Sequence, residues 1–215
     1  MGQKESKGLT VLLIPVLMFF AISASVAVPI LWRGFYMLHI RALDLPGKTG
    51  LDEQTIRTAF NEMMDYCTKN APFGTGALRW SEEGMRHFAD VKKLFLLDLR
   101  VLAVCSLLLV VLLVVTRRVR PALLLGRGPS FYAGICLLLG AGLLTVLASR
   151  DFDRAFVVFH RIFFPGKTNW IFDYRTDEII LILPQVFFRN CAILAVSLLA
   201  LFCAAYLFAG RKKRQ

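Results

Sequence analysis

Four long apolar stretches organise the chain, at about residues 9–31, 94–115, 131–148 and 191–209. Each approaches or exceeds the roughly 20 residues that an α-helix needs to cross the hydrocarbon core of a bilayer. Nearly all charged side chains lie in the segments between and beside these stretches. The pattern therefore predicts an all-α integral membrane protein built on a bundle of four transmembrane helices.

Composition agrees with this class, and the distribution of charge narrows the partners. The chain of 215 residues is 57% hydrophobic and has a formal net charge of +11, whereas soluble domains are about 45–50% apolar. A basic chain can bind nucleic acid, but here the Lys and Arg residues flank apolar stretches, as they do in membrane proteins. We therefore expect contact with membrane lipid and no nucleic-acid partner.

The basic residues also predict how the spans are oriented. The N-terminus, the loop at 116–130 and the tail at 211–214 are basic, and the positive-inside rule assigns such segments to the cytoplasm. Both termini are then cytoplasmic, and the remaining segments, about 32–93 and 149–190, form a small extracytoplasmic cap. The first span is too long for a signal-peptide core. We therefore expect a multi-pass membrane protein that forms one domain over residues 1–215.

The first outer segment contains two helix signals. Asp52 can accept a hydrogen bond at the start of a helix. The apolar positions of that helix recur at helical spacing and are Ile56, Ala59, Phe60, Met63 and Met64. Ser81 can cap a second helix that begins at Glu82 and runs unbroken through His87 into the second span. Residues 71–79, between the two helices, leave room for a loop or for short strands.

The second outer segment is rich in phenylalanine. These residues recur every three or four positions and are Phe152, Phe156, Phe159 and Phe163. After Asp151 the pattern predicts an amphipathic helix that covers the bundle or enters lipid, with His160 at the edge of the apolar stripe. Pro165–Lys167 is predicted as a turn, and Leu183–Pro184 as the break before the fourth span. A helix that only anchors the bundle would show the same stripe.

His87 shares a helix face with two acids. At about 100° per residue, Asp90 and Asp98 fall on the stripe of His87, and either carboxylate could orient the imidazole as in a catalytic triad. The alternative is an interfacial histidine that pairs with an acid only for stability. His87, Asp90 and His160 would make a weak zinc site. We therefore expect neither a metal nor a cofactor.

Other reaction chemistries have less support in the sequence. It contains no Gly-x-Ser-x-Gly elbow, no phosphate-binding glycine loop and no zinc-protease helix. A covalent acyl-enzyme would use Cys67, Ser81 or Cys191. Cys67 has no evident neighbouring base, Ser81 is better explained as a helix cap, and we expect Cys191 to be buried in the fourth span. The N-terminal Met-Gly also matches an acylation signal, which a spanning anchor makes redundant. A proton-linked small transporter, which would need ionisable residues through the bilayer, and a non-catalytic four-span assembly protein are the alternatives to an enzyme.

Two groups of residues, one in each outer segment, resemble a known family. They are Trp80-Ser81-Glu82, His87-Phe88-x-Asp90-Val91-Lys92-x-Leu94-Phe95, Phe159-His160-x-x-Phe163-Phe164, Trp170-x-Phe172-Asp173, Asp177 and Leu183-Pro184-x-x-Phe187-Phe188. In order and over nearly the whole length they are similar to the bacterial four-span family that includes lipoprotein intramolecular transacylase. The resemblance implies a bacterial cell membrane and a diacylated bacterial lipoprotein as the substrate.

The resemblance also implies a reaction, in which the sn-2 acyl chain of a diacylglyceryl-cysteine moves to the α-amino group of the same cysteine. An α-ammonium with a pKa of about 8 must first lose a proton, which an imidazole can accept and later pass to the glycerol oxygen. We therefore expect His87 or His160 as the base, at the outer leaflet, and the other histidine as a group that orients the substrate or stabilises the developing oxyanion. Besides Asp90 and Asp98, the predicted electrostatic partners are Arg86, Lys92, Arg161 and Trp170.

Overall fold

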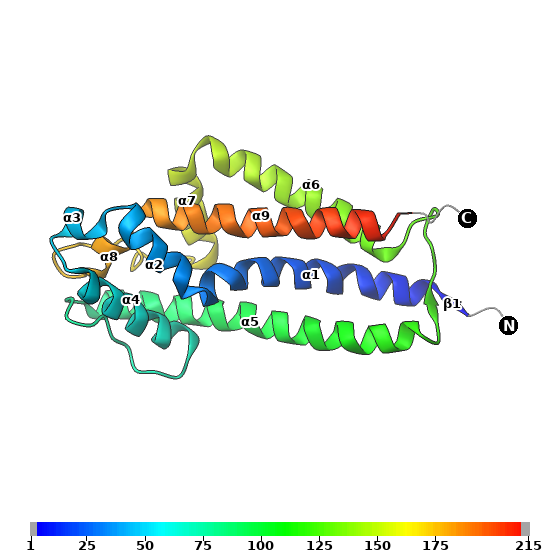
Figure 1. Ribbon diagram of the computed structural model, residues 1–215, viewed down its shortest axis with the longest axis horizontal. Coiled ribbons are helices and arrows are strands. Elements are labelled where there is room, and N and C mark those ends of the chain that lie inside the picture. The colour runs from blue at the N-terminus through cyan, green and yellow to red at the C-terminus, as the bar shows by residue number, and fades with distance from the viewer. Residues whose placement is uncertain (1–3, 212–215) are drawn as a thin grey trace. The chain divides into compact units, whose positions relative to one another are not determined.

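The computed structural model describes residues 4–211. Its elements, in chain order (Figure 1), are β1 (Glu5–Ser6), α1 (Lys7–Leu31), α2 (Arg33–Ala42), α3 (Leu45–Thr49), α4 (Glu53–Thr68), α5 (Glu82–Thr116), β2 (Arg120–Pro121), α6 (Pro129–Arg150), α7 (Phe152–Phe163), α8 (Ile179–Ile182) and α9 (Gln185–Ala209). The predicted all-α class is confirmed. The start of the N-terminal acylation signal, residues 1–3, and the basic tail residues 212–214 lie outside the described part of the chain.

Four helices are long and apolar enough to cross a membrane, namely α1, α5, α6 and α9, so the predicted four-span architecture is confirmed. Helix α5 has 35 residues, which at 1.5 Å per residue makes it about 52 Å long, whereas the hydrocarbon core is about 30 Å thick. Only part of α5 can therefore lie in hydrocarbon. Its apolar part begins at Leu94, so the polar turns from Glu82 to Lys93 lie outside the membrane-spanning segment.

The chain divides into two compact units. We call Met1–Ala27, Asp98–Arg150 and Leu194–Gln215 the transmembrane unit, and Val28–Leu97 and Asp151–Ile193 the histidine unit. All three histidines of the sequence belong to the second unit. The single domain that the sequence suggested stays a prediction.

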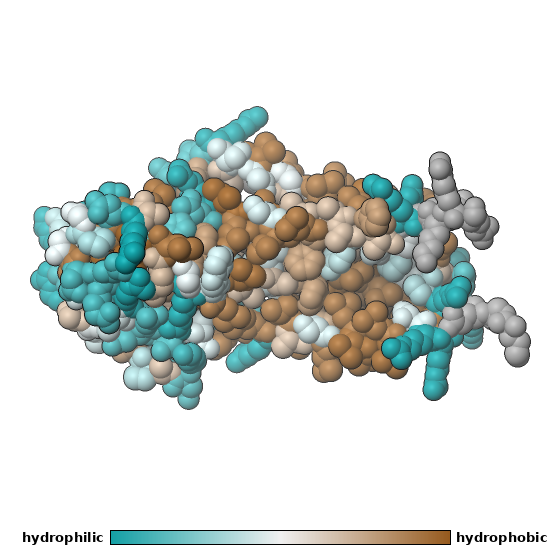
Figure 2. Space-filling view, in the orientation of Figure 1, coloured by the Kyte–Doolittle hydropathy of each residue, from teal (hydrophilic) through white to brown (hydrophobic). Residues whose placement is uncertain are grey.

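Within the transmembrane unit, the helices share small apolar contact clusters. One joins α1 and α5 and contains Leu9, Leu13, Val16, Cys105 and Leu112. Another joins α1, α6 and α9 through Ala21, Leu137 and Cys203. Many of the other apolar side chains point outward, and Figure 2 shows them over much of the visible surface of these helices. Such an exterior fits a hydrocarbon surrounding, in which helices satisfy their backbone groups internally.

The histidine unit has one larger apolar core. It is built mainly from α2, α4 and α8. Tyr36 stacks on Phe60 with 3.6 Å between ring centroids, and the Tyr36 hydroxyl donates to the carbonyl of Ile182 at 2.8 Å. Asp52 accepts from the backbone N–H of Thr55 at 2.9 Å, so the predicted start of α4 is confirmed. This core supports the segments that carry the histidines.

Two connections in this unit have the following local structures. Residues 71–79 form turns and no strand, so of the loop and the short strands left open by the sequence, the loop is formed. The Gly76 N–H in this loop donates to the Glu62 carboxylate at 2.7 Å. The strands within residues 4–211 are instead β1 and β2, which pair in parallel. Leu45–Thr49 form the short helix α3, whose N-cap Asp44 accepts from the Gly47 N–H.

Candidate active site

His87 lies near the N-terminus of α5, and two polar side chains, Ser81 and Asp177, fix this terminus. The Gly84 N–H donates to the Ser81 hydroxyl oxygen at 3.0 Å, so the predicted cap is confirmed. Asp177 accepts from the Ser81 N–H at 2.8 Å and from its hydroxyl at 2.7 Å. A Cβ added at Gly84 would overlap Oδ1 of Asp177. Glycine therefore lets the segment after α7 close onto the helix that carries His87.

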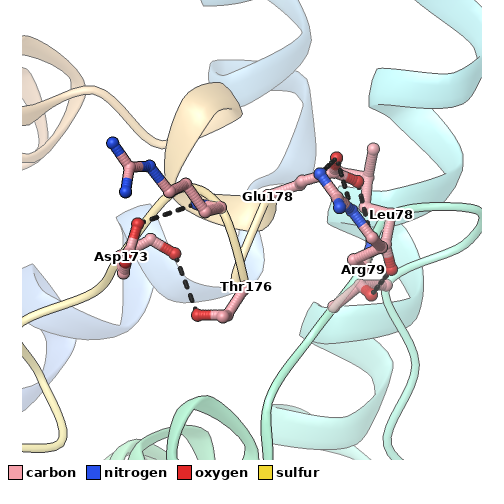
Figure 3. A network of polar contacts seen from close by, with 7 residues as sticks. Leu78, Arg79, Asp173, Thr176 and Glu178 are labelled. Atoms are coloured by element: carbon pink, nitrogen blue, oxygen red, sulfur yellow. Dashed lines mark hydrogen bonds and ion pairs between the residues drawn. The ribbon is translucent and has the colours of Figure 1, made fainter.

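A second link joins the same two segments, as Figure 3 shows. The Nε and backbone N–H groups of Arg79 donate to the Glu178 carboxylate at 2.8 and 2.9 Å. In return, the Glu178 N–H donates to the Arg79 carbonyl at 3.0 Å. Beside them, the Thr176 hydroxyl donates to the carbonyl of Asp173 at 3.2 Å, which shapes the turn. These bonds hold the residues just before α5 against the segment that follows α7.

His160 is positioned by α7, the predicted amphipathic helix. Asp151 caps this helix by accepting from the Arg154 N–H at 2.9 Å. Phe159 and Ile162 are exposed on one side, and His160 is buried on the other. The helix is therefore confirmed, and its periodicity places the imidazole inside the histidine unit.

A backbone carbonyl sets the tautomer of His160. Its Nδ1 lies 2.8 Å from the carbonyl oxygen of Phe156, one turn earlier in α7. Because a carbonyl only accepts, Nδ1 carries the proton, and the neutral ring keeps Nε2 as an acceptor. Within residues 4–211, Nε2 has no hydrogen-bond partner. His160 can therefore take up a proton at Nε2 without changing its tautomer first.

The rings of His87 and His160 lie beside each other, with 5.9 Å between centroids and 30° between planes. His87 is only 5% exposed, and its buried Nδ1 has no hydrogen-bond partner among the described residues. Aromatic rings surround the pair, namely those of Phe88, Phe156, Phe164, Trp170 and Phe172. The two predicted histidines thus meet in a largely apolar environment, with unused hydrogen-bonding capacity on both rings.

Burial keeps both imidazoles neutral. It lowers the pKa of His87 to about 4, an effect that nearby His160 increases and the charge of Asp90 opposes. Burial also lowers the pKa of His160, while the bond to Phe156 opposes that shift. Desolvation penalises the charged form of a base. At neutral pH both rings are therefore in the form that can accept a proton.

Asp90 approaches this pair but does not hydrogen bond to His87. Its carboxylate is instead 3.1 Å from Lys93 Nζ and 2.5 Å from Lys167 Nζ. Burial raises the pKa of Asp90, but hydrogen bonds from Lys167, Lys93 and Asn169 outweigh burial and lower it. Asp90 is thus ionised, and it acts on His87 through charge. The carboxylate–imidazole bond considered from the sequence is not formed.

A pocket of about 320 Å³ opens beside Asp90. Its lining residues are Arg86, Ala89, Asp90, Lys93, Lys167 and Asn169. Oδ1 of Asn169 is buried and has no hydrogen-bond partner among the described residues. Neither histidine belongs to the lining. Five of its six lining residues carry a charged or an amide side chain, whereas aromatic rings surround the two imidazoles.

The other predicted partners have different contacts. Arg86 forms ion pairs with Glu82 and Glu83, and Lys92 Nζ lies 4.3 Å from the ring centroid of Tyr66. Arg161 is exposed, and Asp98 belongs to the transmembrane unit. The Trp170 ring packs on His160 at 4.7 Å, but its N–H donates to the Lys167 carbonyl at 3.0 Å. Of the predicted set, His87, His160, Asp90 and Trp170 therefore cluster.

The side chains considered for a covalent intermediate are poorly placed for attack. Cys67 is 1% exposed, and burial raises the pKa of its thiol to about 12, so it is not a thiolate at neutral pH. Ser81 is engaged by Asp177, and Cys191 packs against the apolar core. Within residues 4–211 no group of three His, Cys, Asp or Glu side chains could hold a metal ion.

The chain and its fold are similar to known proteins. Residues 11–188 match the family model described as lipoprotein intramolecular transacylase Lit. No similar sequence was found among curated proteins. A crystal structure of the membrane integral lipoprotein intramolecular transacylase Lit from Bacillus cereus matches with a TM-score of 0.83 and 19% identity, over 94% of this chain and 92% of that chain.

Two variants of the Bacillus cereus protein match as well. A histidine-to-arginine variant has a TM-score of 0.76 and 18% identity, over 94% of this chain and 88% of that chain. A histidine-to-alanine variant has a TM-score of 0.75 and 19% identity, over 93% of this chain and 91% of that chain. The structural matches support the fold, and the family model covers most of the sequence. The chain therefore belongs to the lipoprotein intramolecular transacylase family and is an integral membrane acyltransferase.

Proposed function

We propose that this enzyme moves the sn-2 acyl chain of a diacylglyceryl-cysteine lipoprotein to the α-amino group of the same cysteine, with His160 as the general base. The supporting observation is the bond between His160 Nδ1 and the Phe156 carbonyl, which leaves Nε2 as an acceptor. His87 has no bond of this kind. We assign His87 the second role, in which its ring N–H stabilises the oxyanion.

The proposed reaction balances without a cofactor. Nε2 of His160 takes one proton from the α-ammonium, and the resulting amine attacks the ester carbonyl, so that a C–N bond forms. The tetrahedral intermediate collapses when the C–O bond to glycerol breaks and the imidazolium protonates the departing oxygen. The nitrogen loses its second proton to solvent. An ester and an ammonium thereby become an amide, a hydroxyl and one released proton.

The aromatic surroundings of the histidines support an intramolecular reaction. The amine and the ester belong to one molecule, and attack closes a ring of roughly eight atoms, so holding that conformation supplies a large part of the rate. Apolar walls also strengthen the interaction between an oxyanion and a fixed N–H donor. The walls around His87 include Phe164 and Phe172, at 5.1 and 5.4 Å between centroids.

The orientation in the membrane is part of the proposal. We place both termini in the cytoplasm and the histidines at the outer leaflet of a bacterial cell membrane. Support comes from the basic segments at the N-terminus, at 116–130 and at 211–214, which the positive-inside rule assigns to the cytoplasm. The substrate amine of a lipoprotein is released on the outer side, where the histidines would meet it.

Tandem mass spectrometry of a reporter lipoprotein tests this function. The N-terminal peptide of the reporter is isolated from three kinds of cells: cells with the enzyme, cells without it, and cells with the His160→Asn variant at equal membrane expression. The acylation of the three peptides is then compared. We expect the enzyme to shift one existing acyl chain from glycerol to nitrogen, and the variant to leave the chain on glycerol. Addition of a third acyl chain would indicate a different acyltransferase. Full transfer by the variant would remove His160 from the base role.

A further inference from the structure

The two lysines on Asp90 reach a buried carboxylate from exposed positions. The side chain of Asp90 is 10% exposed, whereas those of Lys93 and Lys167 are 75% and 45% exposed. Lys93 lies one turn further along α5, and Lys167 comes from the turn after α7. Each places a primary ammonium, Nζ, on one carboxylate oxygen. Asp90 thus already binds the chemical group that a primary amine would present.

One residue that lines the pocket beside Asp90 carries a further, buried acceptor. Oδ1 of Asn169 is buried and unpartnered among the described residues, and Asn169 lines the pocket together with Asp90 and Lys167. A primary ammonium has three N–H donors. Two oxygens of Asp90 and one of Asn169 make three acceptors of the required kind. A buried acceptor that lacks a donor favours the entry of a donor into this pocket.

We propose that Asp90 and Asn169 form the subsite for the α-ammonium of the substrate cysteine, and that Lys167 Nζ occupies this subsite when no substrate is bound. The inference rests on the proposed function, since that reaction begins with a primary ammonium. Binding exchanges one ammonium for another on the same carboxylate. Lys167 therefore competes with the substrate for Asp90.

The position of the subsite suits the reaction. Asp90 follows His87 by three residues on α5, so both side chains lie on one helix face. Asn169 directly precedes Trp170, whose ring packs on His160 at 4.7 Å. Lys93 stays on Asp90 when Lys167 leaves, so the charge of the carboxylate is shared between cations. The bound ammonium is then held beside the histidines. Because Lys93 neutralises part of the Asp90 charge, the carboxylate raises the pKa of the ammonium less and opposes its deprotonation less.

A purely structural ion pair between Asp90 and Lys167 predicts a different result for one variant. Under our proposal, Asp90→Asn raises KM about tenfold or more with little change in kcat, while Lys167→Met lowers KM several-fold because it removes a competitor. If the pair only fastens the turn to α5, both variants weaken the site and raise KM. Lys69→Met is the matched control, since Lys69 is an exposed lysine paired with Asp65 at 2.8 Å.

Direct binding separates this inference from the proposed function. The enzyme is purified in detergent with His160→Asn, which we expect to slow turnover by about 10²- to 10⁴-fold. Its Kd is measured for a diacylglyceryl-cysteinyl peptide with a free α-amine and for an analogue in which a hydroxyl replaces that amine. We expect roughly tenfold preference for the amine, loss of the preference with Asp90→Asn and a larger preference with Lys167→Met. Thermal unfolding of each variant identifies those that fold.

Each outcome decides between the two claims. An unchanged preference in Asp90→Asn, or weaker amine binding in Lys167→Met, overturns the subsite even if the reporter lipoprotein is N-acylated. A clear preference together with no acyl transfer by the unmodified enzyme keeps the subsite and refutes the proposed reaction. If Asp90→Asn does not fold, Lys167→Met still decides, because it changes a half-exposed side chain and its expected effect is a gain.

Discussion

His39 and His160 have the same local geometry in two different regions of the histidine unit. In each, Nδ1 lies close to the carbonyl oxygen four residues earlier, at 2.7 Å from Phe35 and 2.8 Å from Phe156. Each ring also packs on that phenylalanine, with 4.4 and 4.3 Å between centroids. The same helical spacing therefore gives both histidines the same tautomer.

The two regions differ at the other ring nitrogen. Nε2 of His39 lies 2.9 Å from Nδ2 of Asn190, which donates to it. Among the described residues no such donor reaches Nε2 of His160, and the His160 ring lies beside His87. An acceptor that already holds an N–H donor is not available to a substrate. Identical local geometry thus yields a structural histidine in one place and a candidate base in the other.

The largest expected effect is the difference in acyl transfer between substitutions of His160 and of His39. His160→Asn should reduce acyl transfer by about 10²- to 10⁴-fold, the usual contribution of a general base. His39→Asn makes the same substitution at the histidine whose Nε2 already accepts from Asn190. For this variant we expect acyl transfer to stay within a few-fold of the rate of the unmodified enzyme. Single-turnover rates with a diacylated lipopeptide measure both. Equal losses in the two variants would show that Nε2 availability does not distinguish these histidines.

The second prediction concerns His87, which has neither the carbonyl bond nor the amide bond. Its pKa is about 4 in the folded protein and about 6.5 when unfolded. Between these values the unfolded state binds more protons, so stability falls as pH decreases from 6.5 to 4, by about 3 kcal/mol in total. Above pH 6.5 this contribution vanishes.

The measurement for His87 is thermal unfolding in detergent across this pH range. Many carboxyl groups also titrate there, so the informative quantity is the difference between the unmodified enzyme and His87→Asn. We expect the variant to lose less stability on acidification. Parallel pH profiles would contradict the buried, neutral state of His87.

The third prediction concerns the support of His87. Gly84→Ala should destabilise the protein by about 1–3 kcal/mol, because the new methyl group meets Asp177, which Ser81 holds in place. Acyl transfer should fall with it, since Gly84 lies one turn before His87. Gly140→Ala is the control, because a Cβ there meets nothing within 4 Å. If the melting temperature dropped equally in both variants, the loss of stability would come from the changed flexibility of the helices and not from a contact between the new methyl group and Asp177.

The smallest expected effect is at Arg79. Its side chain is 68% exposed in the pair with Glu178, and exposed ion pairs contribute about 0–1 kcal/mol. Arg79→Gln should therefore change the melting temperature slightly and leave acyl transfer near its original rate, whereas Gly84→Ala should not. A large loss of activity in Arg79→Gln would mean that the pair of Arg79 and Glu178 in Figure 3 affects acyl transfer more than its exposure indicates.

Local signals explain which parts of this structure were predictable from the sequence. Asp52, Ser81 and Asp151 cap helices at the expected positions, because a cap and the apolar periodicity after it are set by neighbours within a few residues. The bond from His160 to Phe156 is also local, and the predicted helix contained the information to anticipate it. The Asn190 donor that separates His39 from His160 is 151 residues away.

Long-range contacts explain what was missed. Lys167 reaches Asp90 across 77 residues and Asp177 reaches Ser81 across 96, and neither pairing follows from spacing along one helix. The same helix stripe that correctly grouped His87 with Asp90 also included Asp98, because periodicity records direction around the helix and not what packs against each turn. The position of the His160 ring beside His87, 73 residues earlier, also could not be read from local spacing.

The central claim is that His160 presents an unprotonated Nε2 at neutral pH. Nitrogen NMR of the enzyme labelled in its three histidines reports which ring nitrogen carries the proton, and the single His→Asn variants assign each signal. We expect a proton on Nδ1 and a free, pyridine-type Nε2 for His160, and the same tautomer with a hydrogen-bonded Nε2 for His39. A proton on Nε2 of His160, or a doubly protonated ring, would contradict its role as the base.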